Sequence, residues 1–273
     1  MPLIAVNGVR LHYEDRGSGP PVVMVMGSGS RGRVWHLHQV PELVDRGYRV
    51  ITLDNRGISP SDQCPRGFTV EDMVADTAAL IESLGIGPCL LVGTSLGAQI
   101  VQELTLARPD LVRRAVLMAT RGRTDAVRQA LAEGEIALYD QGVALPPQYE
   151  AAVRAMQNLS PRTLNDPKAV GDWLDLFEMT PPAGAGERIQ MGFSAMPDRL
   201  REYEAIRRPC HVIAFADDLV TPAYLGREVA NRIPHATFDV IPDCGHYGYL
   251  EQPDAVNRSL VAFFESETEE EFS

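Results

Sequence analysis

The chain has 273 residues, of which 45% are hydrophobic and 23% charged, a balance typical of one sizeable globular domain with an extended core. Its formal net charge of −12 argues against nucleic acid or an anionic membrane surface as a partner. The sequence has no run of the roughly 18 apolar residues that a membrane span requires, so we expect no contact with a membrane.

The chain ends and the cysteines indicate where the protein resides. The first residues lack a basic region followed by an apolar core, so we expect no secretion signal. The four cysteines, Cys64, Cys89, Cys210 and Cys244, are scattered and form no CxxC pair, which favours a reduced, cytoplasmic protein without a zinc site. Cys244 lies close to His246, where a reactive thiol is the alternative to the buried bystander that we favour. The acidic stretch 265–273 is expected to form a solvated tail.

The predicted strands begin with a hairpin and continue as apolar runs. Apolar and polar residues alternate from Val9 to Glu14, the pattern of a half-buried antiparallel strand, which places His12 on its polar face. Runs without alternation follow, and these are typical of parallel strands that are covered on both faces. The runs span residues 21–26, 48–54, 89–93, 114–120, 209–216 and 236–242.

Segments with helical periodicity separate most of these runs. They cover residues 34–47, 69–85, 96–110 and 221–233. Strands alternating with helices predict an α/β fold with a mostly parallel, doubly wound sheet, to which the leading hairpin adds an antiparallel edge.

One interval interrupts this alternation. Residues 121–208 contain helical patterns and no convincing strand. We interpret them as an all-helical insertion over the sheet rather than a linker, which divides the chain into a core of residues 1–120 and 209–273 and a helical lid of residues 121–208. The helical patterns cover residues 124–142, 147–160, 166–179 and 186–206.

The pattern Gly-x-Ser-x-Gly stands at residues 93–97, between an apolar strand and a helix. Such a turn holds the serine in a strained conformation that projects its hydroxyl clear of the sheet. Side chains at Gly93 and Gly97 would collide with the neighbouring strand and helix. The amino end of the helix favours negative charge at the serine. Ser95 is therefore a candidate nucleophile, and a purely structural turn is the alternative.

A serine hydroxyl needs a base, and the base needs a carboxylate. Of the six histidines, His246 stands in a loop after the last predicted strand, where Gly245 leaves room for close approach. A satisfied loop histidine is the alternative. The preceding strand ends in Asp217 and Asp218, and the residues by themselves leave both open as the carboxylate.

An oxyanion formed at the serine needs hydrogen-bond donors. The backbone N–H of Leu96 is one candidate, since it opens the helix after Ser95. The glycine-rich loop after the strand at residues 21–26 offers the N–H of Ser28 as the second. The alternative is that this loop only turns the chain.

Over nearly its whole length the sequence resembles the α/β-hydrolase superfamily, through the motifs VVMVMGSG, VITLDNRGISPSD, VGTSLGAQ, IAFADDLVTP and DCGHYGYLEQPDAV. The resemblance implies that Asp218 is the carboxylate, because in the family this residue stands four positions before a proline, here Pro222. It also implies a helical lid and no metal or cofactor. Met26-Gly27 replaces the family's usual His-Gly, which weakens the transfer of any one subfamily's chemistry.

The resemblance implies a serine hydrolase that cleaves an ester, lactone or thioester of a small, fairly apolar molecule through an acyl-enzyme. A serine at this position disfavours the epoxide and haloalkane hydrolases, which use an aspartate. The alternatives are carbon–carbon bond hydrolysis, acyl cyclisation, a haloperoxidase-type perhydrolase and a non-enzymatic ligand-binding protein.

The expected partner is a small-molecule substrate, and the oligomeric state is left open. Arg56 is interpreted as part of a structural turn rather than as a substrate clamp. Most of the lid's apolar residues are expected to pack on the core, and some of them to line an apolar pocket. The candidate pocket residues are Met26, Trp173, Phe177, Met191 and Tyr247.

Overall fold

The computed structural model describes residues 2–266, and its centre is an eight-stranded sheet. The strands are β1 (Leu3–Val6), β2 (Val9–Gly17), β3 (Pro21–Val25), β4 (Arg49–Leu53), β5 (Cys89–Thr94), β6 (Val112–Met118), β7 (Cys210–Phe215) and β8 (Thr237–Ile241). Their order in the sheet is β1-β2-β4-β3-β5-β6-β7-β8. Strands β3 to β8 run parallel, whereas β1 and β2 pair antiparallel and β2 joins β4 antiparallel. The predicted mostly parallel sheet with an antiparallel hairpin is confirmed.

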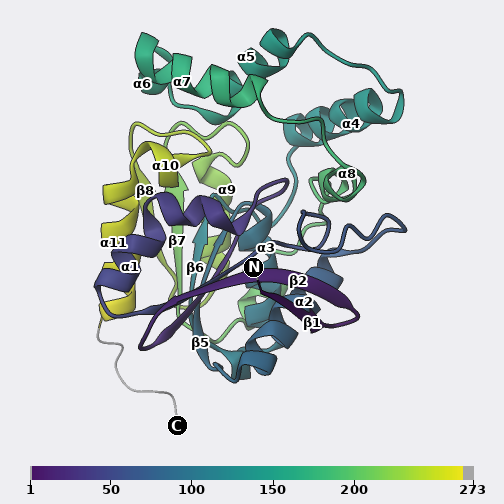
Figure 1. Ribbon diagram of the computed structural model, residues 1–273. Helices are drawn as coiled ribbons and strands as arrows, with labels where there is room; N and C mark the ends of the chain where they lie inside the picture. Colours follow the sequence, from purple (N-terminus) through teal and green to yellow (C-terminus); the bar gives the residue numbers. More distant parts are fainter. Residues whose placement is uncertain (1, 267–273) are drawn as a thin grey trace.

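Helices cover both faces of the sheet (Figure 1). One face carries η1 (Gly32–Leu37), α1 (Gln39–Asp45), α10 (Gly248–Glu251) and α11 (Pro253–Glu265). The other face carries α2 (Val70–Leu84), α3 (Leu96–Ala107), α9 (Ala223–Arg232) and η3 (Glu202–Ala205). A short turn, η2 (Pro109–Leu111), connects α3 to β6. The doubly wound α/β arrangement is therefore confirmed. Within residues 2–266, no helix has the length and apolar character needed to cross a bilayer.

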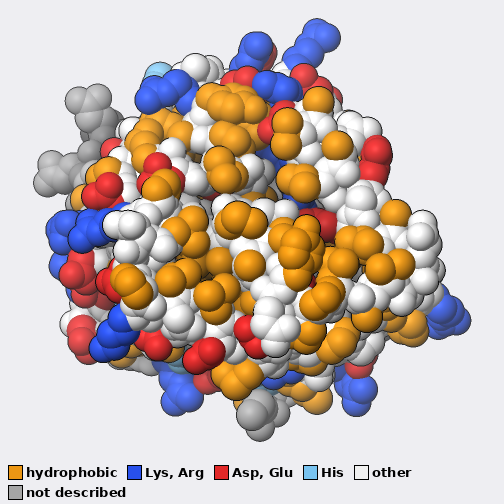
Figure 2. Space-filling model, turned by 90° about the horizontal axis from the view of Figure 1, so that it is seen from above, with side chains coloured by type: hydrophobic (Ala, Val, Ile, Leu, Met, Phe, Trp, Pro, Cys, Tyr) orange, Lys and Arg blue, Asp and Glu red, His pale blue; other side chains and the backbone are white. Residues whose placement is uncertain are grey.

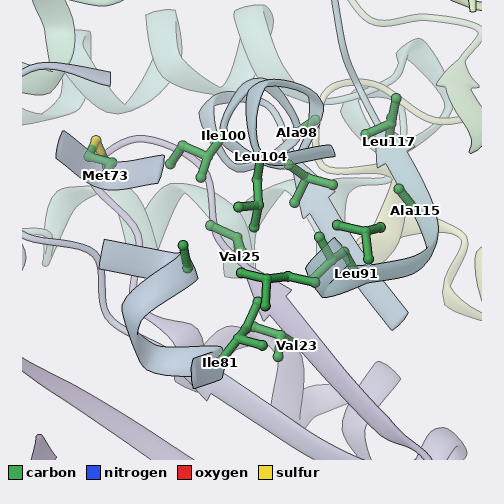
Figure 3. Packing of buried hydrophobic residues seen from close by; sticks show 14 of the residues in the cluster. Val23, Val25, Met73, Ile81, Leu91, Ala98, Ile100, Leu104, Ala115 and Leu117 are labelled. Atoms are coloured by element: carbon green, nitrogen blue, oxygen red, sulfur yellow. The ribbon is translucent and has the colours of Figure 1, made fainter. Parts of the chain in front are cut away.

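The central strands feed two apolar layers, which explains why they lack alternation in the sequence. Val23 and Val25 of β3 point into the layer under α2 and α3, while Val22 and Met24 point into the layer under α1 and α11. The same alternation continues along β5 and β6. Figure 3 shows the first layer, in which side chains of α2 and α3 meet those of the strands. Its labelled residues are Val23, Val25, Met73, Ile81, Leu91, Ala98, Ile100, Leu104, Ala115 and Leu117.

The structure departs from the sequence prediction at the second edge of the sheet and at the end of the chain. Strand β8 was expected to be covered on both faces, but it is an edge strand. Most of its residues are exposed or half-buried, and Val240 is 42% exposed. Helix α11 packs Val256, Leu260 and Phe264 under the sheet and was not predicted. Glu265, placed in the expected tail, is the last residue of α11. The rest of that prediction, at residues 267–273, falls outside the described residues.

The placement of His12 on a polar face is also wrong. His12 is buried, and its Nδ1 lies 2.8 Å from Oδ2 of Asp54, the residue that follows β4. A buried polar side chain needs a hydrogen-bond partner, which Asp54 supplies to His12. Asp54 also accepts a hydrogen bond from the backbone N–H of Gly32 at 2.7 Å, so the pair fixes the start of η1.

Five α-helices, followed by η3, connect β6 to β7, and these five are called the inserted helices below. They are α4 (Ala126–Asp140), α5 (Pro147–Asn158), α6 (Pro161–Leu164), α7 (Pro167–Glu178) and α8 (Ala185–Gly192). They lie at the top of the molecule in Figure 1, beyond the carboxyl ends of the parallel strands. Residues 121–208 are all described and contain no strand, as expected. The predicted helical segment 186–206 is helical only in α8 and η3, with a loop between them.

Candidate active site

Ser95 occupies a sharp turn between β5 and α3. Its backbone has φ 54° and ψ −120°, a left-handed conformation that L-residues adopt at a cost of about 1–3 kcal/mol. The turn is held by hydrogen bonds from Ser95 N to Met118 O of β6 at 3.0 Å and from Ala98 N to Ser95 O at 3.0 Å. The strained serine therefore stands at the carboxyl end of the sheet's centre, directly before the amino end of α3.

The glycines on either side of Ser95 are required by close backbone contacts. A Cβ at Gly93 would lie 2.3 Å from the carbonyl oxygen of Gly97 in α3. A Cβ at Gly97 would lie 2.1 Å from the carbonyl oxygen of Val25 in β3. A side chain at either position would thus collide with the neighbouring helix or strand, as predicted.

We expect Gly97→Ala to lower the free energy of unfolding by about 3 kcal/mol or more, because backbone atoms of β3 must move to admit the methyl group. Gly171→Ala in α7 is the matched control, since a Cβ there meets no atom within 4 Å. The control should be neutral or stabilising by up to about 1 kcal/mol, as expected for alanine in a helix interior. Urea denaturation of both variants measures the difference, and equal stabilities would contradict the packing argument.

His246 and Asp218 form a buried pair. His246 Nδ1 lies 2.8 Å from Asp218 Oδ2, and the two residues are 7% and 3% exposed. Asp218 Oδ1 accepts hydrogen bonds from the backbone N–H groups of Val220 and Thr221, each at 2.8 Å, and Oδ2 accepts one from the Thr221 hydroxyl at 2.7 Å. These donors fix the direction of the carboxylate. Nδ1 of His246 faces Asp218, and within residues 2–266 its Nε2 makes no hydrogen bond, so this nitrogen could act as a base.

The structure distinguishes the two adjacent aspartates. Asp217 is half-buried, and its backbone N–H donates to Cys244 O at 3.0 Å. Its carboxylate makes no hydrogen bond or ion pair with any residue in 2–266. Asp218 is therefore the aspartate that the structure brings to His246.

The backbone around the two predicted oxyanion donors lies against Ser95. A Cβ on Gly27 would lie 3.2 Å from Ser95 Cβ and 3.8 Å from Ser95 Oγ, so the loop that carries Ser28 adjoins the serine hydroxyl. Leu96 is the first residue of α3, where the N–H groups have no partner within the helix. Gly29, the next residue of the loop, donates its N–H to Gln190 Oε1 at 2.9 Å, which fixes the loop's position.

Ser95 and His246 both line a large cavity between the sheet and the inserted helices. Its volume is about 1240 Å³, and apolar surface predominates in its lining. Of the predicted pocket residues, Met26, Phe177, Met191 and Tyr247 line it, as do Ser28 and Leu96. Trp173 does not: its ring stacks on Tyr247 at 5.7 Å between centroids and supports that residue from outside the cavity. Seen from above, the molecule presents many apolar side chains (Figure 2). The exposed apolar residues of the inserted helices include Val127, Tyr149, Met156, Leu176 and Met179.

Two polar side chains attach the inserted helices to the loops of the site. Glu251 accepts hydrogen bonds from the N–H and hydroxyl of Ser160 at 2.9 and 2.7 Å, from the Thr163 hydroxyl, and from the N–H of Gly245 at 2.6 Å. It thereby joins α6 to the residue before His246. Gln190 of α8 receives the Gly29 N–H and donates to Arg56 O at 2.9 Å. The loop before His246 and the loop that carries Ser28 and Gly29 are thus both attached to the inserted helices.

Two residues singled out in the sequence have structural roles. Arg56 is buried and forms a two-pronged ion pair with Asp76 of α2, and it does not line the cavity. The interpretation of Arg56 as a structural residue agrees with this. Cys244 is fully buried, and burial raises the pKa of its thiol to about 12, so a reactive thiolate is disfavoured there.

The sequence reasoning missed Arg121 and Arg128, which line the same cavity. Arg121 follows the β6 run closely, and a polar residue just beyond the carboxyl end of a parallel strand is the signal that could have identified it. Arg128 lies in the first turn of α4 and carries no comparable signal, because its position depends on how the inserted helices pack.

Comparison with known proteins shows the same architecture elsewhere. The model of the alpha/beta hydrolase family matches residues 22–259. A Mycobacterium tuberculosis protein named "Putative non-heme bromoperoxidase BpoC" is 51% identical over 259 residues, covering 94% of this chain and 98% of that protein. Its crystal structure superposes with a TM-score of 0.89, covering 93% of this chain and 95% of the other.

More distant relatives carry hydrolase names. The (E)-2-((N-methylformamido)methylene)succinate hydrolase of Acinetobacter baylyi is 28% identical, covering 95% of this chain and 96% of the relative. The structure of a thermophilic esterase from Thermogutta terrifontis is 26% identical with a TM-score of 0.82, covering 97% of this chain and 98% of the esterase chain. The similarity extends over almost the full length in each case.

Proposed function

The chain belongs to the alpha/beta hydrolase family, and from this premise we propose that it is a serine hydrolase of esters, lactones or thioesters of small organic molecules. The observation that carries the proposal is a strained serine that shares one cavity with a buried His246–Asp218 pair. The family and the hydrolase names of its relatives support a hydrolase. The more specific part of the proposal is that the bond cleaved joins an acyl carbon to oxygen or sulfur.

In the proposed reaction, His246 accepts the proton of Ser95 Oγ as the oxygen attacks the acyl carbon of the substrate. The N–H groups of Leu96 and Ser28 bind the negative oxygen of the tetrahedral intermediate. The intermediate expels the alcohol or thiol, which takes the proton from His246, and leaves an acyl-enzyme. A water molecule, deprotonated by His246, then attacks the acyl carbon; the bond from this carbon to Ser95 Oγ breaks, His246 returns the proton to Oγ, and the acid is released. Asp218 orients the imidazole and stabilises its charged form.

We propose further that the inserted helices, within residues 121–208, act as a lid over a core of residues 1–120 and 209–273. They supply much of the cavity lining, including Phe177 and Met191. A lined volume of about 1240 Å³ with a mainly apolar surface suits a medium-sized organic substrate. Substrate choice therefore depends chiefly on these helices.

A panel of p-nitrophenyl esters of increasing acyl length, with one lactone and one thioester, tests the proposal. We expect measurable turnover of at least one class and labelling of Ser95 by a fluorophosphonate probe, located by peptide mass spectrometry. Labelling at another residue, or none at all, would contradict Ser95 as the nucleophile. Turnover of a diketone with no turnover of any ester would favour carbon–carbon hydrolysis instead.

A second candidate is haloperoxidase activity, which is favoured by the bromoperoxidase name of the M. tuberculosis relative. In this reaction, hydrogen peroxide replaces water in the attack on the acyl-enzyme and releases a peracid, which then oxidises bromide. It uses the same serine, histidine and aspartate. Bromination of monochlorodimedone that depends on peroxide and on a carboxylic acid, and exceeds ester hydrolysis in kcat/KM, would favour this candidate.

A further inference from the structure

Arg121 is a positive charge in the cavity without a negative partner. Its guanidinium donates one hydrogen bond, from Nη2 to the carbonyl oxygen of Ser194 at 2.9 Å. Nη1 is buried and has no hydrogen-bond partner, and no carboxylate in residues 2–266 forms an ion pair with Arg121. Burial lowers the pKa of this guanidinium to about 10. An unpaired charge in such a place is costly unless a ligand compensates it.

Arg128 adds a second positive charge beside the first. Its Nη2 donates to the Ser194 hydroxyl at 3.0 Å and to Glu135 at 3.2 Å, while its Nε is buried without a partner. Both arginines thus meet at Ser194, and Glu135 forms an ion pair with Arg128 but not with Arg121. The carboxylates whose charges act on Arg121 without pairing with it are Asp125 and Asp218. Asp125 accepts hydrogen bonds from Arg128 N at 2.7 Å and from the Tyr224 hydroxyl at 3.2 Å, and Asp218 is engaged by His246 and Thr221.

The remaining charged residues of the cavity do not offset this excess. Glu150 and Glu178 line its wall but are exposed, so water screens their charges. Arg154 lies over the ring of Phe177, 4.8 Å from the ring centre. The pair of arginines at Ser194 thus forms an electropositive region within a mainly apolar lining, apart from Arg154.

This region lies near the reacting serine. Ser95 N donates to Met118 O, and Arg121 comes only three positions after Met118 along the chain. Both residues line the same cavity. A substrate bound with its acyl carbon at Ser95 can therefore extend along the same cavity toward the arginines.

We propose that Arg121 and Arg128 bind a carboxylate of the substrate, so that the natural substrate is an ester, lactone or thioester with an apolar body and a carboxylate at one end. Guanidinium groups bind carboxylates through charge-assisted hydrogen bonds, and the orphaned donors provide the capacity for them. The proposal rests on the proposed function, since it names the substrate class of the same site.

Binding to the Ser95→Ala variant tests the proposal without turnover. The probes are the monomethyl esters of succinate, glutarate and adipate, with 4-acetoxybutanoate for a carboxylate on the alcohol side. Each is compared by isothermal titration calorimetry with a neutral ester of equal length in which a methyl ester replaces the carboxylate. We expect at least one acid to bind about 10- to 100-fold more tightly than its neutral counterpart, as charge-assisted hydrogen bonds provide.

Arginine variants test whether these two residues cause the preference for the acid over the neutral ester. Adding Arg121→Met or Arg128→Gln to the Ser95→Ala variant should weaken binding of the acid at least about tenfold. Binding of the neutral ester should stay within about threefold. Arg123→Met is the matched control, because Arg123 pairs with Glu228 and does not line the cavity. Circular dichroism checks that each variant is folded.

Equal binding of acids and neutral esters across the whole series would overturn the proposal, and this comparison needs no arginine variant. A preference that survives in folded Arg121→Met and Arg128→Gln would overturn it as well. A uniform loss of both probe types would show that the arginines are only structural. Hydrolysis of the same esters by the unaltered protein tests the proposed function separately, so the two failures are distinguishable.

Discussion

Replacement of Ser95 by alanine is expected to reduce kcat for the best ester by about 10⁴-fold or more, since removal of a serine nucleophile leaves only binding and oxyanion stabilisation. The loss should appear in kcat, while KM changes little, because the hydroxyl acts in the chemical step rather than in holding the substrate. Steady-state kinetics with a p-nitrophenyl ester measures both values. Fluorophosphonate labelling at this position should disappear at the same time.

Ser30→Ala is the matched control for this substitution. Ser30 lines the same cavity and loses the same hydroxyl group, but it lies outside the turn between β5 and α3. Its kcat should stay within about threefold of the unaltered protein, the usual range for a surface substitution that breaks no buried interaction. Comparable kcat values for the two alanine variants would exclude Ser95 as the nucleophile.

Asp218→Asn is expected to lower kcat by about 10⁴-fold, because an amide beside Nδ1 favours the wrong tautomer of the histidine and cannot stabilise its charged form. The substitution keeps the shape of the side chain, so the fold should be preserved. Kinetics with the same ester at saturating concentration measures the effect. The urea midpoint of the variant shows whether a loss of stability contributes.

Asp217→Asn makes the same chemical change one residue away. Its carboxylate has no bonded partner within the described part of the chain, so kcat should remain within about threefold of that of the unaltered protein. If Asp217→Asn proved the more damaging of the two variants, Asp218 would not be the residue that orients His246.

The sequence was informative wherever one local rule decided the structure. The continuous apolar runs marked β3 to β7 because each central strand packs against helices on both faces. The collisions at Gly93 and Gly97 followed from the turn itself. The resemblance to a known family, rather than composition or spacing, selected Asp218 over Asp217, and the structure places Asp218 beside His246.

The sequence was less informative wherever the outcome depended on contacts between distant segments. His12 looked solvated because alternation reports on one face of a strand and says nothing of Asp54 on its neighbour. Trp173 was expected in the cavity, but it stacks behind Tyr247, which lines the cavity. Strand β8 resembles a central strand in composition, and only the order of the sheet makes it an edge.

The attachment of the inserted helices through Glu251 limits how they can be exchanged between relatives. A chimera that carried foreign helices on this core would leave the Glu251 carboxylate without the Ser160 and Thr163 donors while it still held Gly245. A half-buried carboxylate that loses its donors costs about 1–3 kcal/mol, and the loss would fall on the residue next to His246. The inserted helices can therefore be exchanged only together with the segment that carries Gly245 and Glu251. Engineered or natural recombination has to transfer both at once.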